Sequence, residues 1–245
     1  MFNRVRNWLR RRRNSLRFGL PFRRSRDARL PSHLRLSETT VELRAPTEAG
    51  VNADFVTVFL DNCYGLLDLT LPANARVIDV GANIGLFSLA TRLRFPDAII
   101  HAYEPNPRLS TFIQHHADAA KFTYFAEAIT VHDGFVSLVD RADSNLVTAV
   151  ASGSSGIPST SFARAVDRIG GSVDLLKLDC EGGEWPLLAD HEVWASVKNV
   201  TFEYHLWATT DVTHEDVVRR LRQLGFSIAS HVREHTTGTI RARRI

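Results

Sequence analysis

The apolar positions of the chain form short continuous runs that alternate with series at helical spacing. A buried run at 75–80 is typical of a parallel strand that is covered on both faces. Gly81 and Gly85 follow, and they allow a sharp turn that brings the backbone close to a ligand. Apolar residues then recur at helical spacing over 86–93, which predicts a helix whose free N–H groups face that turn. A second strand is predicted at 99–104.

The rest of the chain repeats this alternation. Two β-branched runs, at 39–44 and 55–60, predict a leading hairpin, and a helical approach at 64–69 follows it. Further strands are predicted at 122–126, 135–139, 173–179, 199–205, 226–231 and 237–241, and helices at 108–119, 161–169 and 213–224. This order predicts an α/β fold: a doubly wound, mostly parallel Rossmann-like sheet with a C-terminal antiparallel hairpin strand.

Composition indicates the size of the folded domain and the cellular compartment of the protein. The 245 residues are 44% hydrophobic and 23% charged, which is typical of a globular domain with a full core. No apolar run approaches the roughly 18 residues of a membrane span. Cys63 and Cys180 lie in apolar stretches without metal-type spacing, so we expect buried, reduced thiols and a cytoplasmic protein.

The charge is divided sharply along the chain. Residues 1–36 carry twelve arginines against Asp27, a local charge of +11, whereas the remainder has 18 basic and 26 acidic residues. We therefore expect an arginine-rich, disordered arm at 1–36, a strand and helix lead-in at 37–72, and the main domain at 73–245. Arginines mixed with aromatic residues also suit the surface of an anionic membrane, and less well a nucleic acid or a transit peptide.

Acidic residues flank the glycine turn in a way that indicates a nucleotide-like cofactor. Glu104 stands 19 residues after Gly85, near the distance at which Rossmann folds place a carboxylate against ribose hydroxyls. The Gly-x-x-x-Gly spacing lacks the middle glycine that admits a pyrophosphate. Asp79, just before the turn, repels phosphate and suits a cationic cofactor such as S-adenosylmethionine.

Further polar residues follow the predicted strands at the edge where such sheets bind ligands. Glu104 ends one strand and Glu127 follows another. The remaining residues of this kind are Asn83, Asp179, Glu181, Glu203 and His205. So many carboxylates at one edge exceed what solvation requires, and we interpret this edge as the functional site.

Several of these residues lie in motifs that resemble a known family. The motifs are Val77-Ile-Asp-Val-Gly-Ala-Asn-Ile-Gly85, Tyr103-Glu-Pro-Asn-Pro107, Asp174-Leu-Leu-Lys-Leu-Asp-Cys-Glu-Gly-Gly-Glu184 and Glu203-Tyr-His205. Their sequence and order resemble FkbM-type methyltransferases, a branch of the S-adenosylmethionine-dependent class I fold. Tyr103 stands where that family usually has phenylalanine, and the resemblance does not cover the arm or the leading hairpin.

The resemblance implies S-adenosylmethionine as cofactor and methylation of a hydroxyl on a sugar, glycolipid or natural product. Glu104 would accept both ribose hydroxyls, and Glu127 would lie near the adenine. The amino-acid end of the cofactor would lie against Asp79, Gly81, Asn83 and Gly85.

An alcohol acceptor needs a general base, and several side chains could serve. His205 is the first candidate because its ordinary pKa suits neutral pH, and Glu203, Asp179 and Glu181 are rivals. The ordinary alternatives are a histidine satisfied within a strand end, and a Glu181 that caps a helix. A divalent metal held by Asp179, Glu203 and a third ligand is conceivable, but we expect none.

Two other functions compete with the methyltransferase. A nicotinamide-dependent oxidoreductase is disfavoured by the missing middle glycine and by Asp79. A methyltransferase-fold protein without activity, or one directed to RNA, could instead be recruited by the basic arm.

Overall fold

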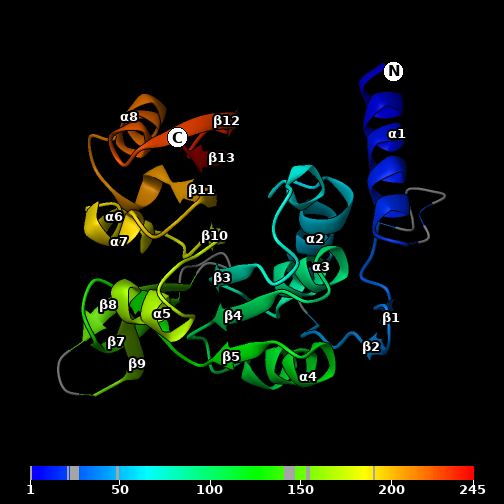
Figure 1. Ribbon diagram of the computed structural model, residues 1–245, viewed down its shortest axis with the longest axis horizontal. Helices are drawn as coiled ribbons and strands as arrows, with labels where there is room; N and C mark the ends of the chain where they lie inside the picture. Colours follow the sequence, from blue (N-terminus) through cyan, green and yellow to red (C-terminus); the bar gives the residue numbers. More distant parts are fainter. Residues whose placement is uncertain are drawn as a thin grey trace.

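The structure is a computed structural model of the 245-residue chain. It describes residues 2–20, 22, 28–47, 50–140, 147–152, 155–189 and 191–245. Figure 1 shows the arrangement of the helices and strands. No helix among the described residues combines the length and apolar character needed to cross a membrane.

Seven strands form the central sheet, in the spatial order β12-β13-β11-β10-β3-β4-β5. The neighbours among β3, β4, β5, β10 and β11 are parallel, whereas β13 runs antiparallel to both β11 and β12. This confirms the predicted α/β fold. The strands are β3 (Arg76–Val80), β4 (Ile99–Tyr103), β5 (Thr123–Phe125), β10 (Leu175–Leu178), β11 (Asn199–His205), β12 (Phe226–Arg233) and β13 (Thr237–Arg244).

Both faces of the central sheet are buried under helices. Val77 belongs to one hydrophobic cluster with α3 and α4, and the next residue, Ile78, belongs to a second cluster with α5 and α8, because successive strand residues face opposite sides. The helices are α1 (Phe2–Arg17), α2 (Gly50–Phe55), α3 (Leu86–Arg94), α4 (Ser110–Ala120), α5 (Phe162–Arg168), α6 (Glu184–Leu187), α7 (His191–Trp194) and α8 (His214–Gln223), with a π-helix η2 (Val56–Leu60) and 3-10 helices η3 (Leu66–Asp68) and η4 (Leu206–Ala208).

A second sheet lies beside the first, and the sequence pattern does not predict it as a unit. Its order is β6-β9-β7-β8, with β6 and β9 parallel and the other pairs antiparallel. The predicted strand at 135–139 is confirmed as part of β7. The four strands are β6 (Ala128–Thr130), β7 (Gly134–Asp140), β8 (Val147–Ser152) and β9 (Ile157–Ser161).

The predicted strand at 55–60 is wrong. This segment is helical, through α2 and η2, and the leading hairpin pairs β1 (His33–Arg35) with β2 (Thr40–Glu42) instead. The rings of Phe55 and Phe59 are 5.3 Å apart at helical spacing, and both are buried in the core. Burial of these aromatic side chains against neighbouring helices outweighs the strand preference of the β-branched residues between them.

The structure also differs from the expected disordered arm and buried thiols. Residues 2–17 form α1, and Phe18 and Leu20 just after it are buried in the first hydrophobic cluster. Cys63 is exposed and Cys180 partly exposed, and both are free. The expectation that Cys63 is buried is therefore wrong, because it follows η2 on the surface rather than inside a strand.

The turn after β3 is held against the end of β10 by backbone packing. Gly81 has a φ of 71°, and a Cβ atom on it would lie 1.6 Å from the carbonyl oxygen of Asp179. Only glycine allows the two strand ends to approach this closely. The glycine at this turn is thus required by the sheet as well as by any ligand above it.

We expect Gly81→Ala to destabilise the protein by about 3 kcal/mol or more, because the new methyl group must displace the β10 backbone. Gly171→Ala is the matched control. Gly171 also has a positive φ, 78°, but nothing lies within 4 Å of the position that an added methyl group would take, so the cost is only the backbone strain of about 1 kcal/mol. Urea unfolding of the two variants measures the difference, and equal destabilisation would contradict the close approach.

Candidate functional site

A cavity of about 690 Å³ opens at the carboxyl ends of the parallel strands. The turns after β3, β4 and β10 form its floor, together with Glu203 on β11. One wall comes from α2, η2 and Tyr64, and another from the second sheet. This is the edge at which open α/β sheets bind ligands, as the sequence predicts. The residues of this wall include Ile129, Phe135 and Val136 from β6 and β7, with Val131 and His132 from the turn between them.

Glu104 lies at the end of β4 with its carboxylate turned toward the glycine turn. Its Oε2 accepts the backbone N–H of Asn83 at 2.8 Å, and its Oε1 accepts that of Asn106 at 2.9 Å. Burial raises the pKa of Glu104 to about 7, although these two backbone donors act in the opposite direction. Both Glu104 and Asn83 line the cavity, as the sequence predicts.

Asp79 and Gly85 support the turn from outside the cavity. Asp79 is fully buried beneath the turn and accepts a hydrogen bond from Ser88 Oγ at 2.7 Å. Burial raises the pKa of Asp79, against the opposing effect of Lys177. Gly85 caps the start of α3 with a φ of 87° and packs against Phe122. Neither residue lines the cavity, so their position differs from the direct contact with the cofactor that we expected.

A buried lysine joins the ends of β3 and β10. Lys177 Nζ donates to the carbonyl oxygen of Gly81 at 2.6 Å and lies 3.5 Å from Asp79 and 3.4 Å from Asp179. Burial alone would lower the pKa of Lys177, but the two aspartates raise it overall, so the ammonium stays charged. The lysine forms part of the family motif, yet sequence reasoning gave it no role.

Three acidic side chains gather at the ends of β10 and β11. The hydroxyl of Tyr64 bridges two of them, because it donates to Asp179 at 2.9 Å and lies within 3.3 Å of Glu203. Burial and the nearby Asp179 raise the pKa of Glu203 to about 8 and that of Glu181 to about 7. All four residues line the cavity. The structure therefore brings three of the four predicted base candidates together.

Asp54 adds a further carboxylate from the opposite wall. It lies on α2, 3.4 Å from the side-chain amide of Asn83. Burial and the Asp179 charge raise the pKa of Asp54 to about 6. Sequence reasoning missed Asp54 and Tyr64 because it assigned their segments to the lead-in. Nothing in the sequence around Asp54 and Tyr64 marks them as site residues. They reach the cavity only because α2 and η2 fold as they do.

His205 lies behind the cavity wall rather than on it. Its Nδ1 is 2.8 Å from Glu184, which also accepts the His205 backbone N–H, and its Nε2 is 3.3 Å from Glu181. Burial lowers its pKa, but the bond to Glu184 and the adjacent charges raise it to about 9. A histidine that is protonated at neutral pH cannot accept a proton, so this geometry disfavours the first candidate for the base.

Glu127 is not brought to the cavity. It forms an ion pair of 2.6 Å with Arg168 of α5, and the Arg168 guanidinium also lies 5.0 Å from the centre of the Phe125 ring. The expected position near the adenine therefore differs from the position in the structure. The pairing partner comes from a helix 41 residues further along the chain, which the sequence does not indicate.

One group of side chains has the spacing of a metal site. Asp179, Glu181 and His205 each offer a ligand atom within 4.8 Å of the others. The pair proposed from the sequence, Asp179 with Glu203, is joined by Tyr64 instead. His205 would have to lose its proton to bind a metal, and the Lys177 ammonium lies 3.4 Å from Asp179. At these three residues the charges favour a salt-bridged cluster over a metal site.

Comparison with known proteins identifies the family. The methyltransferase FkbM domain model matches residues 79–228, which is more than half of the chain. The chain belongs to the FkbM methyltransferase family. It is 27% identical to the 31-O-demethyl-FK506 methyltransferase FkbM of Streptomyces tacrolimicus, over 80% of this chain and 92% of that protein. It is also 28% identical to the methyltransferase sdnD of Sordaria araneosa, over 73% and 83% respectively.

Solved structures resemble this FkbM-family chain more distantly. One is the magnesium protoporphyrin IX methyltransferase of Synechocystis with bound S-adenosylmethionine, at 16% identity and a TM-score of 0.48, with 82% of this chain and 87% of that chain covered. The fibrillarin of Aeropyrum pernix, also with bound S-adenosylmethionine, gives 12% identity and a TM-score of 0.47, with 74% of each chain covered.

Membership of the family implies S-adenosylmethionine as the methyl donor, and the cavity suits that molecule. Its volume of about 690 Å³ lies within the range of cofactor sites. Glu104 is buried with a carboxylate that can accept two hydroxyls. The lining contains six carboxylates (Asp54, Glu104, Asp133, Asp179, Glu181 and Glu203) and one ammonium, Lys177. This excess of acids favours a sulfonium cation and disfavours the pyrophosphate of a nicotinamide dinucleotide.

We expect Glu104→Gln to weaken S-adenosylmethionine binding by roughly 10- to 150-fold, the equivalent of about 1.5–3 kcal/mol for a hydrogen bond to a charged group. Wild-type affinity should also fall as the pH drops below about 7, because protonation removes the carboxylate charge. Calorimetry at several pH values measures both effects. Glu127→Gln is the control, and it should bind as the wild type does. If Glu127→Gln lost affinity for S-adenosylmethionine and Glu104→Gln did not, the cofactor contact would be assigned to Glu127 instead.

His205 should make stability depend on pH in the alkaline range. Its folded pKa of about 9 lies above the ordinary 6.5, so its ion pairs stabilise the protein fully below about pH 6.5 and are lost as the pH rises through about 9. Urea unfolding should show wild type more stable than His205→Asn at about pH 6, with the gap closing above about pH 9. A gap that widens with pH would show that the histidine is neutral in the folded protein.

Proposed function

We propose that this protein transfers the methyl group of S-adenosylmethionine to a hydroxyl of a sugar, glycolipid or natural-product acceptor. The observation that supports this most is the group of partly buried carboxylates at the cavity, in which Glu203 and Glu181 have pKa values raised to about 8 and 7. A base with a pKa near the working pH is what an alcohol acceptor requires. The relative named for methylation of 31-O-demethyl-FK506 agrees with such an acceptor.

Glu203 and Tyr64 have distinct roles in this reaction. Bound S-adenosylmethionine supplies an electrophilic methyl group on a good leaving group. Glu203 takes the proton from the acceptor hydroxyl as the C–O bond forms and the S–C bond breaks, and it later releases that proton to solvent. Tyr64 orients the base through its hydroxyl. Burial keeps the pKa of Tyr64 well above its ordinary value, so its proton is retained.

The second sheet forms the side of the cavity that remains for the acceptor. The glycine turn and Glu104 lie on the β3 and β4 side, whereas β6 and β7 line the other side. That wall presents Ile129, Phe135 and Val136 next to the polar His132 and Asp133. A mixed apolar and polar wall suits an acceptor with both a hydrocarbon skeleton and hydroxyl groups, such as a glycoside or a polyketide.

We expect Glu203→Gln to lower kcat by about 10²- to 10⁴-fold and to leave the Kd for S-adenosylmethionine nearly unchanged. Glu192→Gln, at an exposed glutamate on α7, is the control for loss of a carboxylate. Wild-type kcat should rise with pH to a plateau above about 8, because only ionised Glu203 accepts a proton. Rates measured with radiolabelled methyl donor test this.

His205→Asn separates the two base candidates. The His205 charge lowers the pKa of Glu203, so its removal should move the pH dependence of kcat to higher pH while activity at the plateau is largely retained. Loss of activity at every pH in a folded His205→Asn variant would assign the base to the histidine.

The acceptor class is tested with labelled S-adenosylmethionine and a panel of methyl glycosides, macrolide polyols, glycolipid extract and total RNA. A product label that survives alkali is expected, because a methyl ether resists hydrolysis and a methyl ester does not. Transfer to RNA alone would replace the proposed acceptor. Tight cofactor binding with no transfer to any acceptor would favour the non-catalytic alternative.

A further inference from the structure

The N-terminal helix α1 lies on the protein with its polar side inward. Asn14 and Ser15 are buried, and the Asn14 amide donates to the carbonyl oxygen of Leu60 at 2.9 Å. The guanidinium of Arg11 makes two bonds of 2.8 Å to Asp61, and Arg10 makes a third of 2.7 Å. These contacts attach α1 to the end of η2 through hydrogen bonds and ion pairs, and Trp8 adds partial apolar packing against the first hydrophobic cluster.

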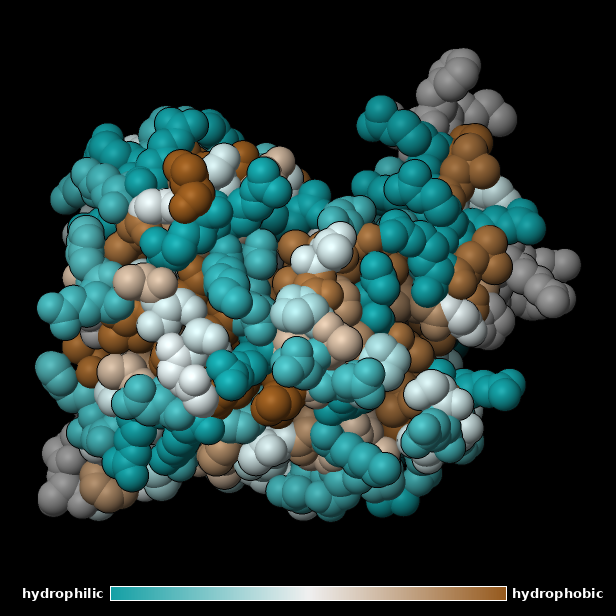
Figure 2. All heavy atoms as spheres, in the orientation of Figure 1, coloured by the Kyte–Doolittle hydropathy of each residue, from teal (hydrophilic) through white to brown (hydrophobic). Residues whose placement is uncertain are grey.

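The apolar side of α1 faces solvent. Val5, Leu9 and Leu16 are exposed by 54%, 55% and 68%. Their spacing of four and eleven residues places them in one narrow stripe along the helix. Figure 2 shows hydrophobic side chains on the outer part of this helix between hydrophilic ones. A helix that serves only to cover the core would have the opposite orientation.

Arginines border the apolar stripe. Arg6, Arg12 and Arg13 are exposed on its two sides, and the helix contains no acidic residue. Trp8 is partly buried beside the stripe, with the Arg12 guanidinium 5.3 Å from its ring centre. An apolar stripe with cationic flanks and an aromatic residue is the composition of a helix that lies in the interface of an anionic membrane.

The position of α1 leaves its outer side accessible. Figure 1 shows α1 at the edge of the molecule, with its N-terminal end projecting beyond α2. Its C-terminal end is fixed to the body, because Phe18, the next residue, packs edge-to-face on Phe59 at 5.2 Å between ring centres. The helix is therefore held rigidly while its apolar stripe points outward, and binding does not require α1 to detach.

We propose that α1 docks the protein on the surface of an anionic lipid bilayer. Val5, Leu9 and Leu16 insert among the lipid chains, and Arg6, Arg12 and Arg13 contact the acidic headgroups. Lipid binding by α1 is independent of methyl transfer, because it is measured without cofactor or acceptor. The negative charge of the remainder of the chain opposes contact elsewhere and orients the protein with α1 toward the membrane.

The test is flotation of the full chain with phosphatidylcholine vesicles, with and without phosphatidylserine. We expect binding only when phosphatidylserine is present, and weaker binding at high salt. Arg6→Gln, Arg12→Gln and Arg13→Gln combined should weaken it roughly a hundredfold, because each arginine near such a surface contributes about a fivefold factor. Leu9→Gln with Leu16→Gln should weaken it at least roughly tenfold.

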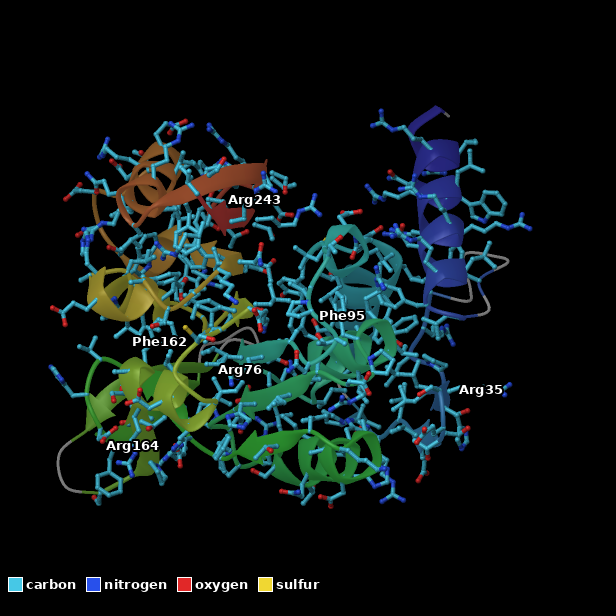
Figure 3. The ribbon with its side chains drawn as sticks, viewed as in Figure 1. Arg35, Arg76, Phe95, Phe162, Arg164 and Arg243 are labelled. Carbon is cyan, nitrogen blue, oxygen red and sulfur yellow. The ribbon has the colours of Figure 1, made fainter. Side chains whose placement is uncertain are left out.

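Matched controls come from exposed residues outside α1. Arg35 and Arg243 lie on β1 and β13 (Figure 3), and replacing both by glutamine together with Arg222 of α8 removes the same charge. Val232→Gln removes an exposed apolar side chain, 60% exposed on β12. Both controls should bind as the wild type does. Circular dichroism verifies that every variant is folded.

Two kinds of result would overturn the proposal. Wild type that fails to float with anionic vesicles, or α1 variants that float as well as the wild type, would show that the stripe does not bind lipid. If the same α1 variants instead abolish self-association or an RNA gel shift, the occupant of the stripe is a second copy or a nucleic acid, and the lipid proposal fails.

Discussion

The buried ammonium of Lys177 is the interaction on which the site depends. It lies between the ends of β3 and β10, where it binds the carbonyl oxygens of Val80 and Gly81 and faces Asp79 and Asp179. An unpaired charge in this position would cost several kcal/mol, so the surrounding oxygens are needed in return. The lysine thus holds the ends of β3 and β10 so close together that only a glycine fits at position 81. This close approach also sets the position of the turn that carries Asn83.

The same charge sets the electrostatics of the cavity. Burial first, and then the charge of the nearby Asp179, which one lysine does not fully offset, raise the pKa values of Glu203, Glu181 and Asp54, so part of the negative charge is relieved by protonation. A cationic ligand would relieve it further. The cavity is therefore predisposed both to a sulfonium cofactor and to a carboxylate base that exchanges protons near neutral pH. One arrangement of charge accounts for both properties.

The sequence predicts the central sheet well because its strands are buried on both faces and read as continuous apolar runs. It also locates Glu104, Asn83, Asp179, Glu181 and Glu203 at the cavity, since each lies within three residues of the end of such a run. The predicted position of a side chain was wrong where an interaction with a residue distant in the chain determines that position. His205 is drawn from the cavity by Glu184, 21 residues earlier, and Glu127 is held by Arg168. Neither pairing leaves a pattern in the sequence around the residue itself.

The lead-in at 37–72 shows a different limit of prediction from the sequence. Its β-branched run indicated a strand, but α2 and η2 are helical because Phe55 and Phe59 pack into the core at helical spacing. This one change has two consequences. It brings Asp54 and Thr57 to the cavity on one side, and it ends at Asp61, which binds the arginines of α1 on the other. The segment that forms one wall of the cavity therefore also binds the arginine-rich helix α1. Because α1 is attached there, its orientation determines how the cavity lies relative to any surface that α1 binds.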